Sequence, residues 1–381
     1  MRLKTVVKLG TVISVLLFAL AIGYYAFTRL DMAEDNRDVN LYHLVPSCSI
    51  GVLDTDNIHA FLNEHPDWNY SHELAGFQFP GLFNFLVNGL NEYMSDAHGL
   101  SNRMNRLLVS FHHPGTSRDQ VVYFRMGMED EQLLADMLQE YMPGNFLPKE
   151  EEYRGKTMRI YPLSNEDFLT VFVEKGFVVL SYQKRLIEEV VDALLDETAL
   201  GNDRVFAEIL PKKKSQNFLR LYGRSASMPF LNMGQECWSE YDFHMNSDVV
   251  YLTGDTYAPG VSDCMGHVSE RLSEVPVVHE DGLLISAEKD STALFMNLAF
   301  EANDKGMWTL FNECVANLSN EASFSLVADM RKVEEEPGRF QAYLPAFVLN
   351  NAALFRSFIL SAQLSLHGER PSHIWVFTYK D

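Results

Sequence analysis

The sequence predicts an α+β protein in which an N-terminal transmembrane helix is followed by two modules of antiparallel sheet with packed helices, related by duplication. Three observations support this class. An uninterrupted apolar run opens the chain, pairs of alternating segments around short turns are typical of β-hairpins, and apolar residues at helical spacing follow these hairpins. The chain has 381 residues, 47% of them hydrophobic, which is enough for one large core or two ordinary ones, and we expect two.

The apolar run, residues 9–27, extends from Leu9 to Phe27 without a charge or a proline. As a helix it would be roughly 28 Å long, close to the hydrocarbon thickness of a bilayer. Residues 1–8 are basic, whereas acidic residues follow Arg29, so the positive-inside rule places residues 1–8 in the cytoplasm. The sequence therefore predicts a single-pass protein of the inner (cytoplasmic) membrane whose soluble part is extracytoplasmic, in the periplasm.

A cleaved signal peptide is the alternative, because Ala19-Leu20-Ala21 offers an A-x-A cleavage site after a shorter apolar core. The run continues past this site, which favours an uncleaved signal-anchor over a soluble periplasmic protein. A lipoprotein anchor is not expected, because Cys48 lies far downstream of the run.

A polar, acidic linker over residues 28–40 leads to the first module, residues 41–210. Apolar alternation, turn residues and helical stripes predict its elements in order. They are a strand at 49–54 with a helix after it, a hairpin of 107–111 and 121–124, a helix over 130–142, a strand around 158–160, a hairpin of 168–173 and 177–180, and a helix that begins after Ser181 and buries Leu186, Ile187, Val190, Val191, Leu194 and Leu195.

The segment Pro-Lys-Lys-Lys-Ser-Gln at 211–216 marks the module boundary, and the second module covers residues 216–381. Its order of strand, helix, hairpin and helix repeats that of the first module, which predicts a diverged duplication. The expected elements are strands at 218–221, 241–245, 249–253 and 323–329, an apolar segment at 283–287, helices over 261–272 and 294–300, and a closing hairpin of 362–366 and 374–379.

Several short motifs together resemble a known family. They are the basic start with its single span, Val45-Pro46-Ser47 before a strand, Leu180-Ser181 before a helix, and the closing Val376-Phe377-Thr378-Tyr379-Lys380. This set is similar to uncharacterised single-pass, membrane-anchored envelope proteins of anaerobic Gram-negative bacteria, a domain-of-unknown-function family. The resemblance covers most of the chain and implies location and architecture only, because that family brings no catalytic residues.

Charge and cysteine content limit the partners and sites. The formal net charge of −21 opposes binding to nucleic acid and keeps an exported domain soluble. No cysteine pair has metal-site spacing, so we expect scattered buried thiols, although export would permit any of three disulfide pairings. The cysteines are Cys48, Cys237, Cys264 and Cys314.

The sequence contains no motif of a catalytic, cofactor-binding or metal site. The segment Asp54-Thr55-Asp56-Asn57 resembles the start of a calcium loop, but His59 and His65 stand where the loop needs Gly and Glu, so we expect a helix cap there. His112 and His113 point to opposite faces of a strand, which favours a role in the turn over joint metal binding.

One aromatic-rich stretch is a possible partner surface, with core packing as the alternative; its residues are Trp68, Tyr70, Phe77 and Phe79. We therefore expect a non-catalytic, membrane-tethered extracytoplasmic protein with an interaction or scaffolding role in the cell envelope. Its partners would be the membrane, through residues 9–27, and an unknown envelope protein or ligand, with no cofactor and no nucleic acid.

The alternative function is an envelope hydrolase whose active site no motif signals. Such a site would gather dispersed carboxylates, for example Asp242, Asp248 or Asp255, around a cleft. Convergence of ionisable side chains in a deep cleft would favour the hydrolase, whereas an open sheet face would favour the interaction protein.

Overall fold

The computed structural model describes residues 39–55, 107–125, 147–210, 219–287 and 309–380, except for 117, 164–166, 175, 235, 281, 351 and 367 within these ranges. Leu134, Ala135, Asp136, Leu138, Gln139 and Phe295 are described as well. The expected membrane span, the linker up to residue 38, the helix after residue 55 and the boundary at 211–216 lie outside these ranges. No helix among the described residues is both long and apolar enough to cross a bilayer.

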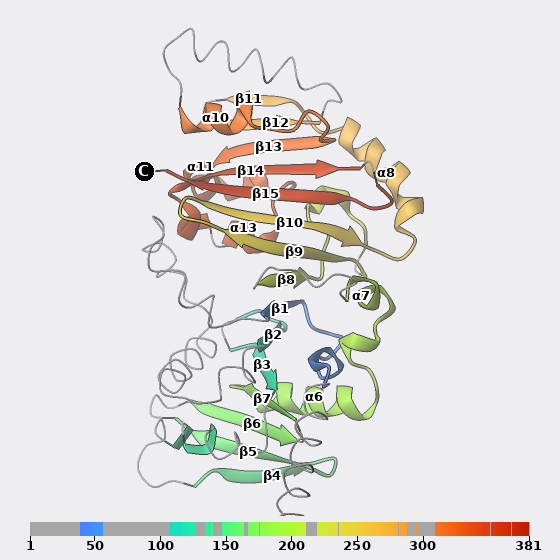
Figure 1. Cartoon of the computed structure of the whole chain (residues 1–381), viewed down its shortest axis with the longest axis vertical. Helices are drawn as coiled ribbons and strands as arrows, with labels where there is room; N and C mark the ends of the chain where they lie inside the picture. Colours follow the sequence, from blue (N-terminus) through green and yellow to red (C-terminus); the bar gives the residue numbers. More distant parts are fainter. Residues whose placement is uncertain are drawn as a thin grey trace, which may run out of the picture.

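The described strands form one antiparallel sheet of 15 strands, stacked along the long axis of the molecule (Figure 1). The strands of the first half of the chain are β1 (Gly51–Thr55), β2 (Leu107–Phe111), β3 (Gln120–Arg125), β4 (Lys149–Tyr153), β5 (Lys156–Pro162), β6 (Phe168–Glu174) and β7 (Phe177–Ser181). Those of the second half are β8 (Arg220–Gly223), β9 (Trp238–Met245), β10 (Val249–Tyr257), β11 (Val278–Glu280), β12 (Leu283–Ser286), β13 (Phe324–Asp329), β14 (Phe358–Ser365) and β15 (Ser372–Tyr379).

The order of the strands in the sheet is β11-β12-β13-β14-β15-β10-β9-β8-β1-β2-β3-β7-β6-β5-β4. The hairpins expected at β2–β3, β6–β7, β9–β10 and β14–β15 are all paired as predicted. The two halves meet where β1 pairs with β8, with Val52 opposite Tyr222 and Asp54 opposite Arg220.

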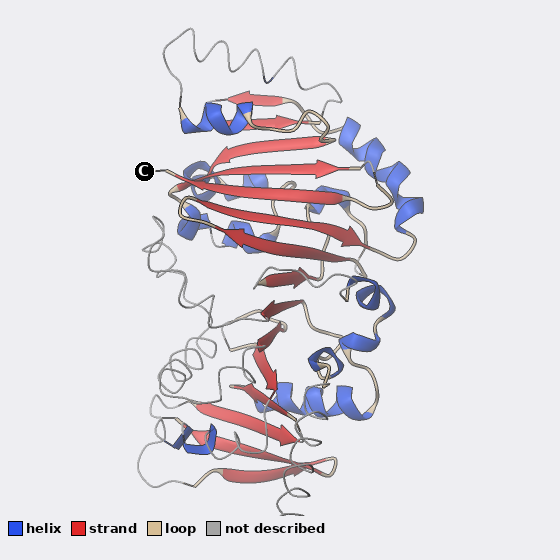
Figure 2. Ribbon diagram, viewed as in Figure 1, coloured by secondary structure: helices blue, strands red, loops and turns tan. Residues whose placement is uncertain are grey.

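The predicted fold class is therefore wrong. The α+β arrangement of two sheet modules behind a transmembrane helix is replaced by a single large sheet that continues through the β1–β8 ladder, with few helices beside it (Figure 2). The physical reason is that β1, which pairs with β2 on one side, and β8, which pairs with β9 on one side, each have a second side available for pairing. Backbone donors and acceptors at such edges pair readily, and periodicity within one segment does not reveal which distant edge is the partner.

The described helices are short, and several begin at side-chain caps. Asp203 caps α7 and Asp329 caps α11 by accepting hydrogen bonds from the backbone N–H groups of Phe206 and Arg331 at 2.9 and 3.0 Å. The helices are η1 (Leu41–His43), α6 (Lys184–Leu195), η4 (Leu200–Asn202), α7 (Arg204–Ile209), η5 (Pro229–Leu231), α8 (Val261–Ser273), α10 (Leu310–Ala316), α11 (Met330–Glu335), α12 (Pro337–Phe340), α13 (Ala346–Asn350) and η6 (Ala352–Phe355), where η denotes a 3₁₀-helix.

The helices cover opposite faces of the sheet in the two halves of the chain. Alternate side chains of a strand point to opposite faces, so the register defines a face A, which includes Tyr123 and Trp238, and a face B, which includes Leu252 and Trp375. In the first half, η1, α6 and α7 pack on face A, whereas in the second half α8, α11, α12 and α13 pack on face B. The exception is α10, which packs on face A over β12, β13 and β14.

Candidate functional site

Between α7 and α10, none of the helices in the described part of the chain covers the strands β9, β10 and β15 on face A. In β15, His373, Trp375 and Phe377 are buried on face B, whereas Ile374 on face A is 37% exposed. The same alternation holds for β10, where Val250 and Leu252 are buried. We call this surface the open strip; its residues are Glu240, Asp242, His244, Tyr251, Thr253, Asp255, Ile374 and Val376.

Helices bound the open strip on two sides. On one side, the Phe206 ring of α7 lies 5.0 Å from the Trp238 ring and 5.2 Å from the Tyr222 ring, measured between centroids. On the other side, α10 packs on Val327 and Ile359. None of the helices that the structure describes packs across the strip between these two positions.

A cluster of charged residues lies at the edge of the open strip nearest to α7. The Nε of Arg220 in β8 lies 2.6 Å from Oδ1 of Asp242 and 3.3 Å from Oε1 of Glu240, both in β9. Arg220 also donates a hydrogen bond of 3.0 Å to the hydroxyl of Tyr222. The Arg220 side chain is only 11% exposed, so this one cation pairs with two carboxylates in a poorly solvated position and offsets part of their charge.

Glu240 has the most perturbed carboxyl group of this cluster. Burial, together with the charges of Asp242 and Asp255, raises the pKa of Glu240 to about 7, even though Arg220 opposes the shift. The hydroxyl of Tyr257 donates to Oε2 of Glu240 at 3.5 Å. Glu240 is therefore a carboxyl group that exchanges its proton near neutral pH.

The structure brings two of the three sequence-predicted carboxylates together. Asp242 and Asp255 both lie on the open strip, and Asp255 accepts a hydrogen bond of 2.6 Å from the Ser372 hydroxyl. Asp248 instead lies in the β9–β10 turn, where the Ser247 hydroxyl donates to it at 2.7 Å. Sequence reasoning missed Glu240 and Arg220, although the charged residues at alternate positions of β9 were a signal that one face of this strand is not core.

The other sequence-predicted positions are placed differently. Asp54 lies within β1 and accepts a hydrogen bond of 2.7 Å from the Tyr42 hydroxyl. The helix that it was expected to cap lies outside the described residues. His112 is buried and His113 is exposed, in agreement with opposite strand faces. The proposed partner surface, Trp68, Tyr70, Phe77 and Phe79, lies outside the described residues.

The described cysteines Cys48, Cys237 and Cys314 are free thiols. Cys237 and Cys314 are buried as expected, whereas Cys48 is exposed. The prediction of scattered buried thiols is thus correct for the first two and wrong for the third.

No protein-family model matches this chain, and no curated protein matches it. A search of solved structures finds similarity to one titled "Structure of crystal form I of TP0453", with 12% sequence identity and a TM-score of 0.30 over 64% of this chain and 90% of that chain. We base no argument on a similarity at this TM-score.

Proposed function

We propose that this protein is a non-catalytic, membrane-tethered extracytoplasmic protein that binds a basic segment of another envelope protein along the open strip. The observation that carries the proposal is the open strip itself, a sheet face with an exposed apolar residue, Ile374, beside carboxylates and hydroxyls. Exposed faces of this mixed character are typical of protein-binding surfaces, whose rims are polar and whose centres are apolar.

The charge of the strip selects the kind of partner. Glu240, Asp242 and Asp255 lie on it or at its edge, and Arg220 compensates for only part of their charge. The whole chain has a formal net charge of −21, so its long-range field attracts cations and repels phosphate backbones. A segment rich in Lys or Arg is therefore the complementary occupant.

The membrane tether rests on the sequence. The apolar run of residues 9–27 follows three basic residues and precedes an acidic segment, which supports insertion with the N-terminus in the cytoplasm. A phosphatase reporter fused after Asp381 should be active in the periplasm, and washed membranes should retain the fusion. Reporter activity only in the cytosol would contradict the topology, and recovery in the soluble periplasmic fraction would contradict the anchor.

The binding proposal can be tested by site-specific photocrosslinking of the full chain in living cells. A photoreactive amino acid at Ile374 should yield an adduct that mass spectrometry maps to a Lys/Arg-rich segment. The control position is Leu147, which is 84% exposed and lies in the first half of the chain. The substitution Asp255→Lys should reduce the Ile374 adduct severalfold, because it reverses one charge of the strip.

Equal adduct yields at Ile374 and Leu147 would contradict the proposal, as would an adduct at Ile374 that maps to an acidic segment or is insensitive to Asp255→Lys. The first outcome would show that the open strip has no specific protein partner, and the other two would show that a basic segment is not its occupant.

Hydrolysis is the second candidate, and one observation favours it. A carboxyl group with a pKa of about 7, such as that of Glu240, suits general acid–base catalysis at neutral pH. Its contact with Arg220 and the burial of both side chains favour a structural role instead. Turnover of a chromogenic ester or glycoside by the full chain, abolished in a Glu240→Gln variant that still folds, would overturn the non-catalytic assignment.

A further inference from the structure

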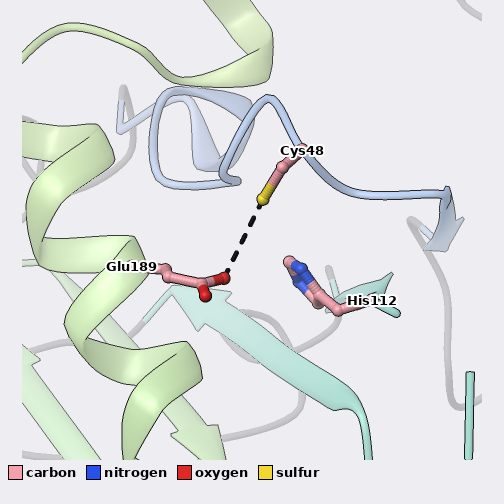
Figure 3. A group of neighbouring side chains, drawn as sticks. All are labelled: Cys48, His112 and Glu189. Carbon is pink, nitrogen blue, oxygen red and sulfur yellow. Dashed lines mark hydrogen bonds between the residues drawn. The ribbon is translucent and has the colours of Figure 1, made fainter. Parts of the chain in front are cut away.

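A second group of functional side chains lies away from the open strip, beside the β2–β3 hairpin. Cys48 comes from the segment before β1, His112 directly follows β2, and Glu189 belongs to α6 (Figure 3). One sulfur, one ring nitrogen and one carboxylate oxygen of these residues all lie within 4.8 Å of one another. Three kinds of metal-binding atom therefore converge from distant parts of the chain.

The segment that carries Cys48 is fixed to the region that follows α6. The backbone N–H of Ser47 donates to the carbonyl of Thr198 at 3.3 Å, and Pro46 forms an isolated β-bridge with Ala199. The N–H of Ser49 in turn donates to the carbonyl of Pro46 at 3.1 Å. The Cys48 side chain is thus held at a defined distance from α6.

The imidazole of His112 is oriented through one of its two nitrogens. A hydrogen bond of 2.7 Å links Nε2 to the hydroxyl of Ser110, which lies 2.9 Å from the hydroxyl of Tyr123. His112 is only 2% exposed, and its other nitrogen, Nδ1, is buried without a hydrogen-bond partner. A buried ring nitrogen without a partner is costly, and a bound cation would satisfy it.

The carboxylate of Glu189 is oriented in the same way. Its Oε1 accepts a hydrogen bond from Nη1 of Arg185, one helical turn earlier in α6. Its Oε2 faces Sγ of Cys48 at 3.8 Å. In both residues, one polar atom is therefore held by a neighbouring side chain, Nε2 of His112 by Ser110 and Oε1 of Glu189 by Arg185. The other atom, Nδ1 or Oε2, is available to a metal ion, as is usual around protein-bound metals.

A catalytic cysteine–histidine pair fits these contacts less well. In such pairs the thiolate is stabilised by nearby positive charge. Here the group beside the thiol is the carboxylate of Glu189, whose Oε2 lies 3.8 Å from Sγ of Cys48.

From this geometry we propose that Cys48, His112 and Glu189 bind a zinc ion, with the fourth coordination position open to water or to an exogenous ligand. Sulfur, imidazole nitrogen and carboxylate oxygen are the ligands of zinc, whereas calcium and magnesium take oxygen ligands. Bond lengths of about 2.0–2.3 Å place the ligand atoms of a tetrahedral zinc site roughly 3.3–3.7 Å apart. The contact of 3.8 Å between Cys48 and Glu189 is close to this value.

The site can be tested with the metal-free full chain, purified without a polyhistidine tag. Titration with Zn²⁺ against a chromogenic chelator should give one tight site per chain. Co²⁺ should give the visible bands of a tetrahedral centre and a thiolate-to-cobalt charge-transfer band in the near ultraviolet. Cys48→Ser, His112→Gln and Glu189→Gln should each weaken zinc binding about 100-fold or more, and Cys48→Ser should abolish the charge-transfer band.

Neighbouring residues provide matched controls. His113→Gln alters the exposed histidine next to His112, and Cys314→Ser alters a buried thiol in the second half of the chain; both should leave the affinity unchanged. Ser110→Ala removes the partner of Nε2 without removing a ligand and should weaken binding about 10-fold. Loss of folding is monitored by circular dichroism of each metal-free variant.

Three results would overturn the assignment. They are the absence of stoichiometric zinc binding by the folded wild-type chain, a cobalt complex without a thiolate band, and equal loss of affinity in His112→Gln and His113→Gln. The site lies apart from the open strip, so none of these results bears on the proposed protein binding.

Discussion

Arg220 of β8 stands opposite Asp54 of β1 in one ladder and opposite Asp242 of β9 in the next. Its guanidinium group bonds to Asp242 at 2.6 Å, at the place where the two halves of the sheet join. A single cation thus lies between carboxylate-bearing strands from both halves of the chain. At this position, loss of the Arg220 side chain would leave two partly buried carboxylates, Glu240 and Asp242, without their counter-charge.

The first prediction concerns this cation. Arg220→Met should lower the free energy of unfolding by about 3–5 kcal/mol, because Glu240 and Asp242 would remain poorly solvated without their counter-charge. Urea unfolding followed by circular dichroism measures the change. Arg339→Met is the control, since its pair with Glu280 is solvent-exposed and should contribute little to the free energy of unfolding. Equal effects of the two substitutions would show that Arg220 has no special role at the join.

The local elements were predictable because each depends on a short segment. The turn at Pro114-Gly115 and the apolar runs on either side of it predict the β2–β3 hairpin, and the stripe of Leu186, Ile187, Val190 and Val191 predicts the buried face of α6. The predicted burial of Leu195, the last residue of that stripe, was wrong, because Leu195 is exposed at the end of α6. Periodicity reports burial within an element and becomes uninformative at its ends.

The join and both sites depend on contacts between residues far apart in the sequence. Nothing in β1 or β8 alone indicates that Asp54 and Arg220 are neighbours, and Cys48, His112 and Glu189 have no common spacing to recognise. Asp242 and Asp255 were named only as members of a dispersed set of carboxylates, and the β9–β10 pairing is what brings their strands together. The partner of Asp242 is Arg220, which a third strand supplies.

The second prediction concerns the pH dependence caused by Glu240. Its pKa is about 7 in the folded chain, above the value of 4.5 for an unperturbed glutamate, so the folded state binds more protons between these pH values. Glu240 therefore makes stability fall as pH rises from about 4.5 to 7, by up to about 1.4 kcal/mol per pH unit. Glu240→Gln should remove this fall. Thermal unfolding at a series of pH values measures it, and the exposed Glu150→Gln should leave the profile unchanged.

The third prediction has the opposite sign and concerns His373. Burial lowers the pKa of His373 to about 3, while its Nε2 donates to the carbonyl of Glu240 at 3.0 Å. The unfolded chain binds the proton more readily, so the stabilising contribution is complete above about pH 6.5 and is lost as pH falls toward 3. His373→Gln should reduce the difference in melting temperature between pH 7 and pH 5. The exposed His267→Gln should not reduce it; an unchanged difference in His373→Gln would contradict the assignment.

The last prediction compares two glycines that differ in their surroundings. A Cβ at Gly254 of β10 would lie 1.8 Å from the carbonyl oxygen of Glu240, whereas a Cβ at Gly266 of α8 would meet no atom within 4 Å. Gly254→Ala should therefore force β9 and β10 apart and lower the free energy of unfolding by about 3 kcal/mol or more, as other forced overpacking does. Gly266→Ala should instead stabilise the protein by about 0.5–1 kcal/mol, because alanine loses less conformational freedom in a helix.

Urea unfolding of both variants measures the contrast, and a destabilised Gly266→Ala beside an unaffected Gly254→Ala would show that the β9–β10 pair is not packed as described. Because β9 carries Glu240 and Asp242, Gly254→Ala should also raise the exposure of the charged cluster and bring the pKa of Glu240 back toward its ordinary value, which the pH profile of the variant would reveal.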